Sequence, residues 1–511
     1  MSFDAISCSG VGNTAGQAQT LAQTAQAAQP AGAGKPAGTA CPKDSVEISE
    51  QGKKLAATQK QEAAKIAGKN NVIASMTFKS GRTVNIEKVI FENESDALDQ
   101  PGTFTDEHRA TRGQKFGFRV NIFDPTGRTE KTFLLREDAI LNEDESGKLQ
   151  MKKYVEGAET EGNDLIIGLE GKNLRGGDGD DTIVELSSSH LIQSCQSQSD
   201  TFLNIDAGAG NDTVVVKGRA WKHILTGDGD DVVKVDSMYG GVIDTGNGND
   251  VIEAEHLHGN INTGNGNDVI EAGHLHGNIN TGNGNDVIEV EYIHGNINTG
   301  DGNDVVKGPH LGGNINTGNG NDVIEADYLY GNINTGDGND VVKSPHFGGN
   351  ITTGDGNDVV SVEFLYKSSI DTGDGDDVVQ GLYRVDDCSV DTGNGNDHVQ
   401  LAWNGIVTNS SISTGAGNDT ITGGGGLRNM RIDSGAGNDR LNFTAGYVAN
   451  SVIYTGDGND YFFLAGALVK SLLDAGKGND KIFLFGDTRG SNIKTGSGNN
   501  TLFIRGKLIS G

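Results

Sequence analysis

The stretch TGNGNDVIEAEHLHGNIN (Thr245–Asn262) is followed at once by TGNGNDVIEAGHLHGNIN (Thr263–Asn280). The same Gly-x-Gly-x-Asp/Asn turn recurs from Gly177 to Gly496, and the spacing between turns is 18 residues throughout the run from Gly246 to Gly354. Flanking copies are mostly 19 to 22 residues apart. Sequence repeats with a period of this length are typical of a solenoid, in which each repeat forms one coil.

Within a coil numbered from Thr245 as position 1, positions 8, 13 and 17 are apolar, as in Ile252, Leu257 and Ile261. So few apolar side chains cannot form a core in one coil, but stacked coils would align them in continuous columns. The segments around VIEA and NIN alternate apolar and polar residues, which predicts short strands with one face inward. Successive coils would then pair as parallel strands, about 4.8 Å apart.

We therefore expect an all-β protein, a parallel β-roll or β-solenoid of about 18 coils over residues 157–511. GND at 162–164 is a degenerate first copy of the turn. Residues 71–155 contain alternating or β-rich runs around turn signals and predict a small β-rich domain. The Ala/Gln/Thr/Gly-rich residues 1–43 predict a disordered leader, and residues 44–70 carry the capping and charge pattern of a helical segment.

Position 6 of the coil carries an Asp in every full copy of the turn except the last, where Asn500 takes its place. Glycines at positions 2 and 4 are explained by tight turns, which also accept Asn or Ser, so the turn alone does not explain the recurring carboxylate. Stacking would bring these carboxylates about 5 Å apart, and each neighbour repulsion would cost about 3 kcal/mol at an effective dielectric constant of 20. A divalent cation between coils would remove that repulsion. A calcium-free coil whose Asp and Asn residues only build turns remains the alternative.

GGDGDDTIV (Gly176–Val184) and TGNGNDVIE resemble the calcium-binding nonapeptide of the repeats-in-toxin (hemolysin-type) family, which forms a parallel β-roll. The resemblance implies several Ca²⁺ ions, with the position-6 carboxylates and turn carbonyls as ligands. The second half of each coil lacks the motif, so we expect one row of calcium along one edge, similar to the half-loaded coils of bacterial adhesin solenoids. The implied metal ligands are Asp181, Asp212, Asp231, Asp250, Asp268, Asp286, Asp304, Asp322, Asp340, Asp358, Asp377, Asp397, Asp419, Asp439, Asp460 and Asp480.

The composition limits the classes of partner. A formal net charge of −30 over 511 residues disfavours nucleic acid and anionic membranes and favours cations. The chain has no apolar run of transmembrane length, and its N-terminus lacks the basic and apolar regions of a Sec-type signal peptide. The four cysteines lie far apart, without the spacing of a metal site.

Two further sets of positions form rows. Rings occupy position 12 and part of position 14, from His256 and His258 onward, and predict either an outward stack of rings or a strip that binds metal or sugar. Asn residues at positions 16 and 18, beginning with Asn260 and Asn262, predict hydrogen-bonded amide ladders or a flat face for glycan or ice. Ice binding is disfavoured, because the turn position that carries Thr in the ice-binding relative is Asn, Asp, Ala, Lys or Ser here.

We expect a secreted or cell-surface bacterial protein whose calcium-loaded solenoid is an adhesive surface or scaffold, with calcium and a glycan or cell-surface ligand as partners. One alternative is an acidic, glycine-rich effector exported by a type III system. Another is a polysaccharide lyase or epimerase built on a β-helix. We expect no enzyme activity, because the sequence contains none of the common nucleophile, zinc-protease or phosphate-loop motifs.

Overall fold

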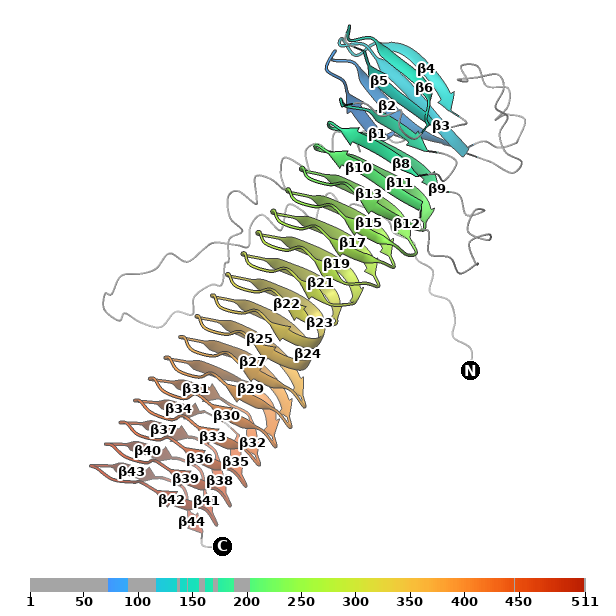
Figure 1. Ribbon diagram of the computed structural model, residues 1–511. Coiled ribbons are helices and arrows are strands. Elements are labelled where there is room, and N and C mark those ends of the chain that lie inside the picture. Colours follow the sequence, from blue (N-terminus) through green and yellow to red (C-terminus); the bar gives the residue numbers. More distant parts are fainter. Residues whose placement is uncertain are drawn as a thin grey trace, which may run out of the picture. The chain divides into compact units, whose positions relative to one another are not determined.

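The computed structural model describes residues 72–90, 116–135, 138–144, 146–155, 161–168, 173–187, 203–444 and 446–509. The expected leader (1–43) and helical segment (44–70) lie outside these residues. The described residues form strands, turns and loops, and among them no helix is long and apolar enough to cross a bilayer. The strands form one sheet of four strands and one of 40 strands, which confirms an all-β solenoid of about 17 turns preceded by a small sheet (Figure 1).

The small sheet is an antiparallel meander of β1 to β4. The predicted turns at Ser80-Gly81 and 124–127 join its strands, and Gly81 and Gly127 have φ values of 81° and 83°, which suit glycine. Asp124 Oδ1 accepts hydrogen bonds from the backbone N–H groups of Thr126 and Arg128, at 2.9 and 3.0 Å. The strands are β1 (Val72–Thr77), β2 (Thr83–Ile90), β3 (Phe116–Phe123) and β4 (Thr129–Leu135).

The next strands belong to the 40-stranded sheet, so the segment 71–155 is divided between the two sheets. Strand β5 pairs antiparallel with both β6 and β7, and β7 begins the parallel stacking by pairing with β9. These strands are β5 (Ala139–Glu143), β6 (Leu149–Lys153), β7 (Leu165–Gly168), β8 (Leu174–Asp178) and β9 (Thr182–Ser187).

From β10 to β30 most coils contribute a long strand and a short strand, each paired in parallel with its equivalent in the next coil. In two coils the strands merge into one of 12 residues. The strands are β10 (Leu203–Ala209), β11 (Thr213–Ala220), β12 (Lys222–Leu225), β13 (Val232–Met238), β14 (Val242–Asp244), β15 (Val251–Leu257), β16 (Asn260–Asn262), β17 (Val269–Leu275), β18 (Ile279–Asn280), β19 (Val287–His294), β20 (Ile297–Asn298), β21 (Val305–Gly312), β22 (Ile315–Asn316), β23 (Val323–Asn334), β24 (Val341–Thr352), β25 (Val359–Tyr366), β26 (Ser369–Asp371), β27 (Val378–Asp386), β28 (Ser389–Asp391), β29 (His398–Thr408) and β30 (Ser411–Ser413).

The last coils contain three strands each, and every strand pairs with the third strand after it. A residue with positive φ, such as Asn429 (φ 55°) or Asn450 (φ 50°), separates the second and third strands of these coils. The strands are β31 (Thr420–Gly423), β32 (Gly426–Arg428), β33 (Arg431–Asp433), β34 (Arg440–Phe443), β35 (Tyr447–Ala449), β36 (Val452–Tyr454), β37 (Tyr461–Leu464), β38 (Ala467–Val469), β39 (Leu472–Asp474), β40 (Lys481–Leu484), β41 (Thr488–Arg489), β42 (Asn492–Lys494), β43 (Thr501–Ile504) and β44 (Leu508–Ile509).

The register stacks like on like, as the repeat predicts. Ile252 pairs with Ile270, and Leu257 with Leu275. Glu255 and His256 are both exposed, and two consecutive outward residues in a strand place a corner of the coil there.

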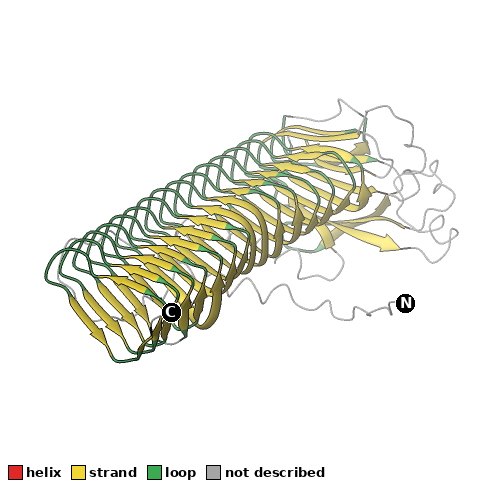
Figure 2. Ribbon diagram, turned by 90° about the horizontal axis from the view of Figure 1, so that it is seen from below, coloured by secondary structure: helices red, strands yellow, loops and turns green. Residues whose placement is uncertain are grey.

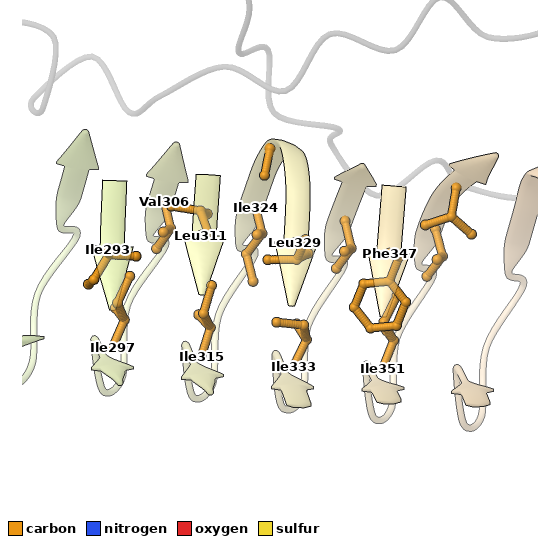
Figure 3. Close-up of a cluster of buried hydrophobic side chains, with 14 of the residues drawn as sticks. Ile293, Ile297, Val306, Leu311, Ile315, Ile324, Leu329, Ile333, Phe347 and Ile351 are labelled. Carbon is orange, nitrogen blue, oxygen red and sulfur yellow. The ribbon is translucent and has the colours of Figure 1, made fainter. Parts of the chain in front are cut away.

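The predicted apolar columns form the core of the solenoid. Positions 8, 13 and 17 are at most 5% exposed in the central coils, and position 10, which carries Ala254 and its equivalents, adds a shallower column. These side chains belong to one continuous cluster that extends from Ile140 to Leu484. Figure 3 shows the columns over successive coils, with Phe347 in the place that Leu311 and Leu329 take in other coils. Each coil therefore depends on its neighbours for burial.

The four-stranded sheet packs on the outer face of the first coils. Its core residues, such as Ile86 and Val120, form a cluster with Leu141, Val184 and Val215. The adjacent residues of the same strands, including Ile183 and Val214, point into the solenoid core instead. The first coils are therefore apolar on both faces, and this explains why segments such as VVV at 214–216 do not alternate.

Candidate functional site: a row of buried aspartates

The Gly-x-Gly-x-Asp turns lie one above another, and Figure 2 shows the loops of successive coils in line along one edge. The glycines are needed for both conformation and space. Gly246 and Gly248 have φ values of 89° and 141°. A Cβ atom at Gly264 would lie 1.7 Å from the carbonyl oxygen of Gly246 in the preceding coil. Any larger residue would therefore separate the coils.

All 16 predicted aspartates lie in this one row, and each is at most 2% exposed. The backbone N–H of each Asp before Asp480 donates to Oδ1 of the Asp in the following coil, at 2.7–3.0 Å; Asp250 to Asp268 (2.9 Å) and Asp304 to Asp322 (2.8 Å) are examples. We call these residues, together with Asp164, the aspartate row. The sequence placed them at an edge of the coil, whereas the structure buries them beneath the turn.

The second oxygen of these carboxylates has no protein partner in most coils. Among the described residues, Oδ2 is buried without a hydrogen bond in every predicted aspartate except Asp268 and Asp397. In those two coils the position-1 hydroxyl group donates to Oδ2, from Thr263 and from Thr392 (2.6 Å). Buried polar atoms are rarely left unpaired, so the row of Oδ2 atoms indicates a missing partner.

Burial dominates the electrostatics of the row. Loss of solvation raises the pKa of Asp250, Asp304 and Asp340 to about 8 and that of Asp286 to about 6, against an ordinary value near 4. Hydrogen bonds from backbone N–H groups act in the opposite direction, as does the Thr263 hydroxyl group on Asp268. Neighbouring carboxylates add to the increase, as Asp268 does for Asp250. The row therefore needs protons or cations near neutral pH.

The two ends of the row show what the turn itself requires. Asp164, from the degenerate GND at 162–164, is fully buried, and its N–H donates to Asp181 Oδ1 at 2.7 Å. The sequence-based ligand set omitted this residue, although the GND triplet indicated it. At the other end, Asn500 Oδ1 accepts from the N–H of Asp480 at 2.7 Å, and its amide group donates to the carbonyl of Thr495. In this half-buried last coil an amide supplies the same acceptor, so the acceptor role alone does not require a carboxylate.

The donor set fits calcium better than it fits a metal whose ligands are all side chains. Each coil contributes one carboxylate to the row, and the described residues contain no group of three or more His, Cys, Asp or Glu side chains that could hold a metal. A cation here would require carboxylates of successive coils together with carbonyl oxygens of the glycine turn. All of these are oxygen donors, as Ca²⁺ prefers. When bound, Ca²⁺ would give the buried Oδ2 atoms a positively charged partner.

The other two rows act as ladders between coils. The position-12 rings from His256 to Phe364 stack face to face, with centroids 4.5–5.1 Å apart and interplanar angles of 7–20°. The Asn rows are hydrogen-bonded, as from Asn280 Nδ2 to Asn262 Oδ1 at 2.8 Å and from the Asn278 N–H to Asn260 Oδ1 at 2.9 Å. Ring stacking and amide ladders are confirmed as the arrangement of these positions.

No protein-family model matches the chain, and no curated protein matches it. Among solved structures, the chain is similar to the "X-ray crystal structure of a hyperactive, Ca2+-dependent, beta-helical antifreeze protein from an Antarctic bacterium". The two chains are 21% identical, the match covers 57% of this chain and 81% of the other, and the TM-score is 0.35.

Proposed function

We propose that the aspartate row binds Ca²⁺ between successive coils and that calcium completes the folding of the solenoid. The observation that carries this proposal is the set of buried Oδ2 atoms without partners. In the last coil, where Asn500 takes the place of the aspartate, an amide supplies the same backbone acceptor. Ligand binding to the folded state alone raises the free energy of unfolding, by about 2.7 kcal/mol for one site at 100 times its Kd. Many such sites in one array would make folding strongly dependent on calcium.

The role we propose for the folded solenoid is that of a secreted or cell-surface adhesive surface or scaffold. Three features support it: the array is rigidly stacked, its regular faces carry exposed rings and amides, and its charge of −30 favours cations over nucleic acid. Export in an unfolded state at low calcium, followed by folding in extracellular calcium, would suit this design. We propose a binding role and no catalysis for the chain.

A calcium titration of the purified full chain tests the metal proposal. Chelator-treated protein is titrated with CaCl₂ while circular dichroism follows the β signal and calorimetry counts the bound ions. We expect several ions per chain, a gain in β signal and a large increase in melting temperature. If chelator-treated protein keeps its full β signal and its melting temperature is unchanged by CaCl₂, the proposal is wrong.

A further inference from the structure

The stack of rings at position 14 is interrupted in a regular way. His258, His276 and His294 stack with centroids 4.6 and 5.2 Å apart. In the following coils this position alternates between glycine and tyrosine, as Gly312, Tyr330, Gly348 and Tyr366. Tyr330 and Tyr366 therefore flank a coil that has no side chain at this level. Lys367 Nζ lies 5.1 Å from the centroid of the Tyr366 ring. Coils repeat at about 4.8 Å, so the two tyrosines are about 9.6 Å apart along the array.

A cleft of about 400 Å³ lies at this interruption. Tyr330 and Tyr366 are 53% and 59% exposed. The ring of Tyr330 is inclined by only 21° to the stacked ring of Tyr328, so it presents a face along the array, toward Gly348. The cleft is lined by Tyr330, His346, Phe364, Tyr366, Arg384 and Asp386, among others, and we call it the tyrosine cleft.

One edge of the tyrosine cleft is polar. Arg384 and Asp386 are in register with Phe364 and Tyr366, so a cation and an anion replace the two rings in the next coil. Asp386 Oδ1 is fixed by Thr408 Oγ1 at 2.6 Å and Asn409 Nδ2 at 2.9 Å, and these bonds lower the pKa of its carboxyl group. Among the described residues, none makes a hydrogen bond or ion pair with the Arg384 guanidinium. An oriented acceptor and a free donor thus lie beside two aromatic rings, Tyr330 and Tyr366.

We propose that the tyrosine cleft binds one pyranose unit of a neutral glycan, inserted between Tyr330 and Tyr366 in place of the missing side chain of residue 348. The backbones that carry the two rings are about 9.6 Å apart, and the Tyr330 ring leans toward Gly348 in this gap, where the puckered sugar chair would be inserted. Arg384 would donate to a sugar hydroxyl group and Asp386 would accept from one. An apolar cleft with a few oriented polar groups is the usual form of a small-ligand site.

Charge distinguishes this ligand from the other classes that rings attract. Aromatic clefts also bind quaternary ammonium groups, but the Arg384 guanidinium in the lining would repel such a cation. A polyanionic glycan would be repelled by Asp386 and by the net charge of −30. A neutral sugar can form hydrogen bonds with both Arg384 and Asp386, and neither residue repels it.

This inference names a ligand class for the adhesive surface proposed above and rests on that role, but the cleft can be tested separately from calcium binding. The full chain, in CaCl₂, is run in native gels containing hydroxyethyl cellulose, laminarin, dextran or yeast mannan, with alginate gels for comparison and phosphocholine as a competitor.

The variants are Tyr366→Ala, which removes one wall of the cleft, and Gly348→His, which fills the gap with the ring type found at position 14 elsewhere. Gly348 has no positive φ, and an added Cβ meets only the Tyr330 side chain, at 3.2 Å, so a shift of that ring by a few tenths of an ångström should let this variant fold. Tyr292→Ala, an exposed stacked ring outside the cleft, is the control.

We expect at least one neutral polysaccharide to retard the native protein. Tyr366→Ala should weaken the apparent affinity at least tenfold, Gly348→His should abolish retardation while keeping the circular dichroism spectrum, and Tyr292→Ala should behave as the native chain. The proposal is overturned if no neutral polysaccharide retards the protein, if Gly348→His binds as well as the native chain, or if only alginate retards it or phosphocholine displaces it. Failure of the calcium proposal would appear instead as chelator-resistant folding, with the effect of Gly348→His unchanged.

Discussion

The backbone N–H of Asp480 donates to Oδ1 of Asn500 at 2.7 Å, in the same way that every preceding coil uses a carboxylate. The amide group of Asn500 also has an acceptor, the carbonyl of Thr495. The chain thus contains its own comparison of an amide with a carboxylate at one position. The comparison separates two roles of this position. The turn needs one hydrogen-bond acceptor, and the carboxylate adds a buried negative charge.

Replacing central members of the aspartate row by asparagine should separate calcium binding from folding. In the triple variant Asp286→Asn, Asp304→Asn, Asp322→Asn, each amide keeps the Oδ1 acceptor and removes a like charge from its neighbours. Without metal, the melting temperature should stay the same or rise by a few degrees, whereas the increase caused by CaCl₂ should shrink and fewer ions should bind. Scanning fluorimetry with EGTA and with CaCl₂ measures both effects. Asp301→Asn, at an exposed turn position that is Asn in many coils, is the control and should behave as the native chain.

The stability of the metal-free chain should fall as pH rises. Burial raises the folded-state pKa to about 6 for Asp286 and about 8 for Asp304, against about 3.9 in an unfolded chain. The folded state therefore binds more protons in this interval, and the contribution of the row, complete below about pH 4, is lost as pH rises through about 6 to 8. With calcium the trend should reverse, because the metal competes with these protons. Melting temperatures at pH 5.5 and 8.5, in EGTA and in CaCl₂, would contradict this account if both series had the same slope.

Calcium should stabilise the chain much more than magnesium does. The oxygens proposed as ligands are single carboxylates of successive coils and carbonyl groups of the glycine turns. Ca²⁺ accepts such oxygen donors in irregular geometry. Magnesium requires a near-ideal octahedron and loses its water reluctantly. At equal millimolar concentrations we expect MgCl₂ to produce less than a third of the increase in melting temperature that CaCl₂ produces. Equal increases would indicate general screening of charge by divalent ions.

Glycines in the turn should resist substitution far more than glycines outside it. Gly284→Ala would place a Cβ 1.5 Å from the carbonyl oxygen of Gly266, at a φ of 148°. We expect this change to cost several kcal/mol, because strain and separation of two coils add together. Gly348→Ala, with its nearest contact on the Tyr330 side chain at 3.2 Å, should change stability by less than about 1 kcal/mol. Urea unfolding of both variants in CaCl₂ would show whether the turn or glycine content in general limits stability.

A cavity in the aliphatic column should weaken neighbouring coils. Leu329 is fully buried between Leu311 and Phe347, and Leu329→Ala should cost about 2–5 kcal/mol. Because each coil is covered only by its neighbours, amide exchange should accelerate in β21, β23 and β24 and remain slow in distant coils. Asp327→Ala, at an exposed position of the same strand, serves as the control. Uniform acceleration along the whole solenoid would contradict this nearest-neighbour behaviour.

The sequence by itself determined the coil. The 18-residue period, the apolar positions 8, 13 and 17 and the turn glycines fix which residues point inward, because stacking in register is the only way for so few apolar residues to be buried. The same periodicity placed the recurring aspartates in one row. It also placed the rings and Asn residues in ladders, whose contacts the structure confirms.

Only the tertiary structure decided how deeply the aspartates are buried, which oxygen has a partner and how the array begins. Burial depends on how the turn folds over its own side chain, and a repeat pattern carries no information on that depth. The role of the four-stranded sheet was also not predictable, because its contacts with Val184 and Val215 join residues far apart in the chain. The tyrosine cleft likewise arises where residues from successive coils, Tyr330, Gly348 and Tyr366, come together in space, and no short stretch of sequence contains that relationship.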